Sequence, residues 1–171
     1  MSKSLTDLIA ILALKRPELV DALNPPASDE DIASLEHTLG VSLPSDFVSA
    51  LKVGNGQKGS QPGIFDEHAF YSCVEIASDW RVWKKLLDGG DFDDERSSPS
   101  AGIRPDWWNP GWIPFTSNGS GDCFCLDMVP TPEGRIGQII FVWHDMADRQ
   151  NVSDSFSAWI SALCAAQGDY Q

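Results

Sequence analysis

The feature that most constrains the fold of this chain is a change in hydrophobic period about halfway along it. In the first half, apolar residues recur at three- and four-residue spacing, which is the period of an amphipathic helix. In the second half they alternate every second residue, as in a strand with one face on the core. Helices followed by strands predict an α+β fold, and a length of 171 residues suits a single domain spanning residues 1–171.

Capping and turn residues mark the predicted element boundaries. The pairs Ser4/Asp7 and Ser28/Asp31 have the three-residue spacing of helix starts, and Gly40 suits a left-handed helix stop. The predicted elements are helices beginning near residues 4, 28 and 44, a helix over about residues 75–87, strands over 112–115, 122–129 and 136–143, and a last helix from near residue 153. The third of these strands is largely apolar and is therefore predicted to be central.

Residues 88–106 form a predicted loop, and long loops within a compact domain are usually functional or disordered. Its charged residues are Asp88, Asp91, Asp93, Asp94, Glu95, Arg96, Arg104 and Asp106. Trp107, Trp108 and Trp112 follow this acidic stretch. We expect Trp112 in the core, whereas Trp107 and Trp108 can either pack inside or present aromatic anchors to a partner.

The whole chain is acidic, with 12 basic and 25 acidic residues, a formal net charge of -13 and a pI near 4.3. Such a surface repels nucleic acid and anionic membranes, and it attracts a basic protein partner. Acidity that serves only solubility is the other interpretation. Because no signal peptide and no membrane-spanning run is evident, we expect a cytoplasmic protein.

Motifs for chemistry are weak. Cys123 and Cys125 are spaced to share one face of a strand, and all four cysteines are predicted to be buried free thiols. The pair His144-Asp145, with Asp127, is the remote possibility of a metal-dependent hydrolase, but a polar strand end explains it better. We therefore expect no catalytic residue, no cofactor and no metal.

Three stretches together resemble the Smi/Knr branch of the SUKH superfamily. They are Glu36, Leu39-Gly40, Leu43-Pro44, Asp46-Phe47 and Asn55-Gly56; then Trp112-Ile113-Pro114-Phe115, Gly121-Asp122 and Leu126-Asp127; then Gly137-Gln138 and Ser155-Phe156. The resemblance covers about residues 28–165 and leaves residues 1–27 as an N-terminal helical extension. Asp154 departs from the family pattern, which often has Ala before Ser-Phe.

The resemblance implies N-terminal helices packed on a mixed, largely antiparallel sheet, a C-terminal helix, and a non-catalytic protein-binding domain. Bacterial members are often immunity proteins that neutralise a toxin, and fungal members regulate cell-wall glucan synthesis. Small size and acidity favour an immunity-type protein that binds a basic toxin, such as a nuclease, and the regulatory module is the alternative. The residues predicted to bind the partner are Asp93, Asp94, Glu95, Trp107, Trp108 and Asp122.

Overall fold

The structure is a computed structural model that describes residues 1–59 and 62–168. The helices are α1 (Leu5–Lys15), α2 (Pro17–Asp21), α3 (Asp29–Leu39), α4 (Ser45–Leu51), α5 (Cys73–Asp88) and α6 (Phe156–Gly168). The strands are β1 (Ala69–Phe70), β2 (Ser98–Pro99), β3 (Trp112–Pro114), β4 (Thr116–Ser117), β5 (Cys123–Asp127), β6 (Gln138–Val142) and β7 (Asp148–Ser153).

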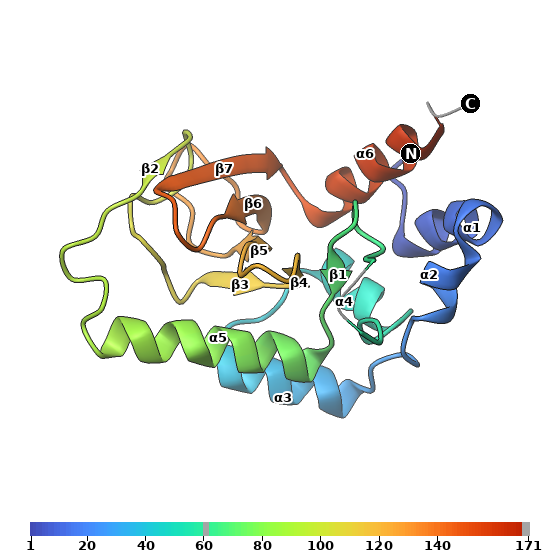
Figure 1. Ribbon diagram of the computed structural model, residues 1–171, viewed down its shortest axis with the longest axis horizontal. Helices are drawn as coiled ribbons and strands as arrows, with labels where there is room; N and C mark the ends of the chain where they lie inside the picture. The colour runs from blue at the N-terminus through green and yellow to red at the C-terminus, as the bar shows by residue number, and fades with distance from the viewer. Residues whose placement is uncertain (60–61, 169–171) are drawn as a thin grey trace.

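The main sheet has five strands in the order β2-β7-β6-β5-β3 (Figure 1). Strand β2 pairs parallel to β7, and the other neighbours pair antiparallel. Strands β1 and β4 form a separate antiparallel pair. The expectation of a mixed, largely antiparallel sheet with the strand after residue 136 at its centre is therefore confirmed.

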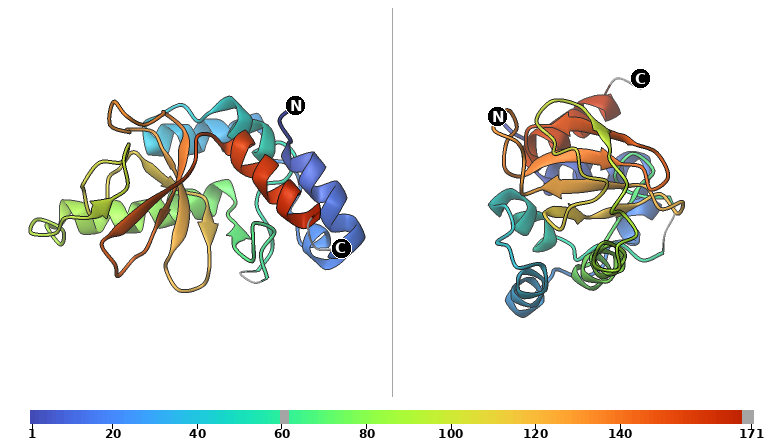
Figure 2. Two further views of the ribbon diagram at one scale, coloured as in Figure 1. Left: turned by 90° about the horizontal axis from the view of Figure 1, so that it is seen from above. Right: turned by 90° about the vertical axis from the view of Figure 1, so that its left-hand side faces the viewer.

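Helices cover the sheet in two groups. Helices α3 and α5 run side by side beneath it in Figure 1, and α5 packs on β3. Helix α6 packs on β6 and β7, and α1 lies beside α6 at one end of the molecule (Figures 1 and 2). The loop between α5 and β2 lies at the opposite end (Figure 1).

Aromatic side chains fill the space between α4, α6 and the small sheet. Phe47 packs edge-on against Phe156 with ring centroids 5.2 Å apart, and Phe65 packs on Trp159 at 5.0 Å. Phe115 contacts both Phe47 and Phe156. Since each of these rings is nearly or fully buried, they make up a large share of the apolar area that stabilises the fold.

Helix starts follow the expected capping chemistry. Ser4, Ser28 and Ser72 each accept from the backbone N–H three residues on, and in each case the acidic side chain there accepts from the cap backbone in return. Gly40 ends α3 at φ 70°, in the left-handed region that glycine adopts without strain.

The Asn55-Gly56 turn positions the start of α5. The Asn55 Oδ1 accepts from Cys73 N at 2.8 Å, and a Cβ on Gly56 would lie 2.3 Å from Ser72 N. Gly56 also has φ 72°, so a side chain there is excluded by conformation and by space. This close approach fixes α4 against the first turn of α5.

Four details of the sequence prediction are wrong. Residues 88–106 contain β2, the segment before the last helix forms β7, and α6 begins at Phe156. Strand β5 is buried on both faces, because Cys123 and Cys125 are as buried as Leu126. The thiols of Cys123 and Cys125 do share one face, 3.5 Å apart, and all four cysteines are buried and free as expected.

Candidate functional site

The loop after α5 lies at one end of the molecule (Figure 1). It carries a group of exposed acidic residues. We call this group the acidic loop; its members are Asp88, Asp91, Asp93, Asp94 and Glu95. Asp88 forms an ion pair with Lys84 at 2.6 Å. Within residues 1–59 and 62–168, the other four carboxylates form no ion pair. The acidic loop is therefore a concentrated negative surface open to a partner.

A stack of aromatic rings holds the acidic loop from beneath. Phe92 packs on Trp83 with centroids 5.8 Å apart, and Trp83 stacks on Trp108 at 6.1 Å and 13°. Trp108 also meets Trp80 edge-on at 6.3 Å. Trp108 is only 3% exposed, so its prediction as a surface anchor is corrected: it packs beneath the loop instead of facing a partner.

Trp107 is half-buried and lies next to the acidic loop. A bridge between Arg96 and Asp106 brings the end of the loop beside the segment that leads into Trp107. The guanidinium of Arg149 lies over the Trp107 ring, 4.9 Å from its centroid, and donates to the Trp107 carbonyl at 2.6 Å. Arg149 thus holds Trp107 in position, directly after Asp106, whose backbone pairs with Arg96 at the end of the loop.

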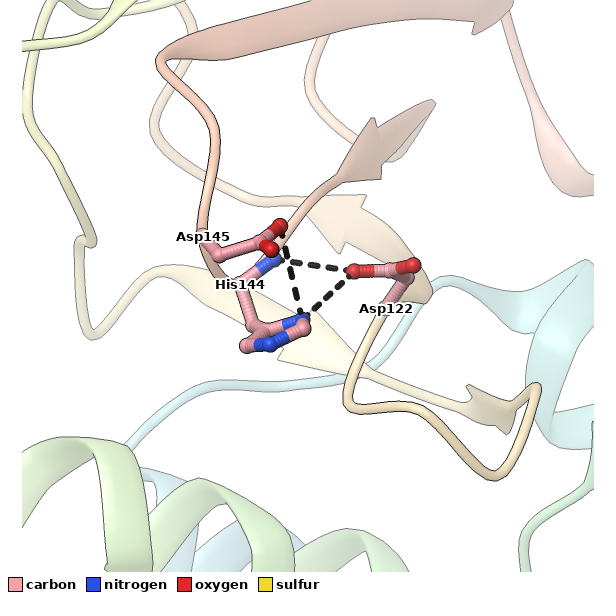
Figure 3. A group of neighbouring side chains, drawn as sticks. All are labelled: Asp122, His144 and Asp145. Carbon is pink, nitrogen blue, oxygen red and sulfur yellow. Dashed lines mark hydrogen bonds and ion pairs between the residues drawn. The ribbon is translucent and has the colours of Figure 1, made fainter.

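Asp122 lies outside the acidic loop, directly before β5. Its Oδ1 accepts from the backbone N–H of His144 at 3.0 Å and lies 2.8 Å from His144 Nδ1, while its Oδ2 accepts from Asn118 at 3.0 Å. Asp145 Oδ1 lies 3.8 Å from the same ring nitrogen (Figure 3). One ligand atom from each of Asp122, His144 and Asp145 therefore lies within 4.8 Å of the others.

Electrostatics couple Asp122 to His144. Partial burial pulls the pKa of Asp122 upward, but hydrogen bonds from His144 and Asn118 outweigh it and leave that pKa below its ordinary value. The hydrogen bond to Asp122 raises the pKa of His144. The pair therefore forms an ion pair when His144 is protonated.

Asp127 cannot take part in the metal site of a hydrolase with His144 and Asp145, as the sequence had suggested. Asp127 is fully buried and accepts from Gln138 Nε2 at 2.8 Å and from Val129 N at 3.0 Å. In the pairing of β5 with β6, Asp127 opposes Gln138 at one end, whereas Cys123, next to Asp122, opposes Val142 at the other. Asp127 therefore cannot converge with His144 and Asp145. The acidic residue that does lie beside His144 and Asp145 is Asp122, which the sequence did not reveal.

Helices packed on a mixed sheet, with an Asn-Gly turn against α5 and a Trp-Ile-Pro edge strand, form an α+β domain, as the resemblance to the SUKH superfamily implies. Residues 26–162 match the SMI1 / KNR4 family (SUKH-1), and the chain belongs to that family.

The similar proteins include several fungal regulators. One is a glucan synthesis regulatory protein of Neurospora crassa, 26% identical over 86% of this chain and 34% of that protein. Another is the cell wall biosynthesis/cell cycle regulator smi1 of Schizosaccharomyces pombe, 28% identical over 80% of this chain and 30% of that protein. A third is the cell wall assembly regulator SMI1 of Saccharomyces cerevisiae, 21% identical over 84% of this chain and 36% of that protein. The chain thus spans about a third of the length of these relatives. Among its described residues, none of the helices has the length and apolar character needed to cross a bilayer.

Proposed function

We propose that this chain is a non-catalytic regulatory domain that binds other proteins in the control of cell-wall or glucan synthesis. The observation that carries the proposal is the match over residues 26–162 to a family whose similar members are named as cell-wall and glucan-synthesis regulators. This was the alternative interpretation of the sequence, and the relatives favour it over an immunity role.

The proposed binding surface is the acidic loop together with the exposed part of Trp107. Asp93, Asp94 and Glu95 supply charge, and Trp107 supplies an aromatic contact of the kind enriched at interface hot spots. The aromatic stack under the loop limits the ordering entropy that binding would otherwise cost. Asp122, which is mostly covered and paired with His144, has no part in this surface.

The partner of such a surface is a protein with a basic patch. Opposite charge steers association, and the net charge of -13 makes nucleic acid and anionic membranes unfavourable partners. We further propose that the domain works in the cytoplasm, together with the proteins that it regulates.

A second candidate is the immunity-type protein that neutralises a basic toxin, for which nuclease toxins are the natural class. The net charge of -13 favours it, because an acidic inhibitor is steered onto a basic enzyme. The names of the fungal relatives point to regulation, so this candidate stands second.

Tagged purification from the native host, with bound proteins identified by mass spectrometry, tests the proposal. We expect proteins of wall synthesis or its signalling, and we expect the double variant Asp93→Lys/Asp94→Lys to lose them. The control Asp21→Lys/Glu133→Lys makes the same change in charge at exposed positions outside the acidic loop.

The two candidates give different results in this experiment. Recovery of a single basic toxin-like protein near one-to-one would replace the regulatory proposal by the immunity role. Equal loss of partners in both double variants would mean that overall charge, and not the acidic loop, controls binding.

A further inference from the structure

The turn over residues 118–122 and the loop over residues 143–147 meet at Asp122, His144 and Asp145 (Figure 3). We infer that these three side chains bind a divalent transition-metal ion, with Zn²⁺ as the best match. Neither the family match nor the names of the relatives assigns such a site. The inference is independent of the proposed regulatory function.

The distances suit a shared ion. Zinc–ligand bonds to His nitrogen and carboxylate oxygen are about 2.0–2.2 Å, so two ligand atoms on one tetrahedral ion lie roughly 3.4 Å apart. The His144 Nδ1 lies 2.8 Å from Asp122 Oδ1 and 3.8 Å from Asp145 Oδ1. The first distance is shorter and the second is longer than the separation of two ligand atoms on one ion. Small rotations of the side chains bring all three atoms onto one ion.

The backbone holds the ligands at this distance without the ion. Strand pairing sets Cys123 opposite Val142. Asp122, next to Cys123, and His144, two residues after Val142, therefore lie at the same end of the sheet. Asn118 donates to the outer oxygen of Asp122 and so orients its carboxylate, as outer partners of metal ligands commonly do. A Cβ on Gly121 would lie 3.0 Å from the His144 ring, so glycine gives the imidazole room.

The chemistry of the donors selects the class of ion. One imidazole nitrogen with two carboxylate oxygens suits Zn²⁺ and neighbouring transition ions, whereas Ca²⁺ and Mg²⁺ sites are built from oxygen alone. The side chains of His144 and Asp145 are 43% and 67% exposed, so an ion can enter and keep a water ligand. The net charge of -13 also raises the local concentration of cations.

A bound ion would cross-link two loops that are otherwise joined by hydrogen bonds and an ion pair. The loop over residues 143–147 continues directly into β7, which begins at Asp148. Because the ion binds the folded arrangement of ligands from two loops, it is expected to stabilise the fold.

Titration of the metal-free protein with ZnCl₂ by isothermal calorimetry tests the inference. We expect one Zn²⁺ per chain and a rise in the unfolding temperature. His144→Ala and Asp145→Asn should each weaken binding by about tenfold or more, and Asn118→Ala by about tenfold, because it removes only an orienting partner. The controls His37→Ala and Asp21→Asn, exposed residues elsewhere, should bind like the unchanged protein.

Two results would overturn the inference. One is a lack of stoichiometric Zn²⁺ binding by the unchanged, folded protein. The other is binding that survives both His144→Ala and Asp145→Asn, which would mark an adventitious ion or one held by the cysteine thiols. Both variants alter exposed side chains, so their folding is checked by unchanged circular dichroism spectra.

Discussion

At the scale of single residues, Arg149 is the least ordinary group in the molecule. It is 1% exposed, and among the described residues its guanidinium contacts no carboxylate. It donates instead to the carbonyls of Trp107, Met146 and Asp148, and the rings of Trp107 and Trp112 flank it. Carbonyl dipoles and aromatic faces thus offset the cost of burying the charge, and burial lowers the pKa of Arg149.

Asp79 is a half-buried acidic group, and we expect its effect on the free energy of unfolding to change with pH. It lies half-buried on α5, where burial raises its pKa. Between the unfolded pKa, near 4, and the raised folded pKa, the folded state holds more protons than the unfolded chain. Burial of Asp79 therefore costs no stability at low pH, where the carboxyl is protonated in both states. The free energy of unfolding falls as pH rises from the unfolded pKa through the folded pKa.

Asp79→Asn should therefore raise the free energy of unfolding by up to about 1 kcal/mol near pH 7 and give no gain near pH 4. Urea unfolding followed by tryptophan fluorescence at both pH values measures this. Asp21→Asn, at an exposed position, should change neither value. A gain that is the same at both pH values would show that burial of the charge is not the cause.

At the scale of elements, the N-cap of α5 supports the aromatic stack that carries the acidic loop. Ser72 accepts from Glu75 N at 3.2 Å, and Glu75 accepts from Ser72 N at 2.7 Å. Ser72→Ala should lower the free energy of unfolding by about 1 kcal/mol, because it leaves a first-turn N–H without its acceptor.

Denaturant unfolding of Ser72→Ala beside Ser78→Ala checks that prediction. Ser78 is exposed in the middle of the same helix, so its change to alanine should be neutral or slightly stabilising. If the two variants lost equal stability, the capping box would contribute nothing beyond helix propensity.

The helices could be predicted because their signals are local. A cap and its partner lie three residues apart, so Ser28 and Asp31 identify the start of α3 without knowledge of the rest of the chain. Strand β7 could not be predicted, since its buried residue is Arg149 while Val152 is exposed, the reverse of the usual pattern. Strand β2 is two residues long and pairs with a segment about fifty residues away, which no local pattern reveals.

In the candidate site, too, local features could be predicted from the sequence but contacts between distant segments could not. The exposure of the carboxylates in the acidic loop could be predicted from the sequence, because a stretch dense in acidic residues is usually solvated. The burial of Trp108 depends on Trp83 from α5, and the meeting of Asp122 with His144 depends on strand register. Both are contacts between distant segments, so composition and spacing could not decide them.

At the scale of the whole molecule, the excess of negative charge should destabilise the fold at low ionic strength. A net charge of -13 leaves many carboxylates without a basic neighbour, and the ion pairs among the described residues are largely exposed and individually weak. Added NaCl shortens the Debye length from about 30 Å at 0.01 M to about 10 Å at 0.1 M, which screens repulsion between distant carboxylates.

We therefore expect the unfolding temperature to rise by several degrees between about 0.01 M and about 0.3 M NaCl at neutral pH. Differential scanning fluorimetry across that range measures the rise. The variant Asp93→Lys/Asp94→Lys, which is less acidic at the loop, should start at a higher unfolding temperature and gain less from salt. A fall in unfolding temperature with salt would mean that ion pairs such as Arg16–Glu18 outweigh the repulsion, and that the acidity does not strain the fold.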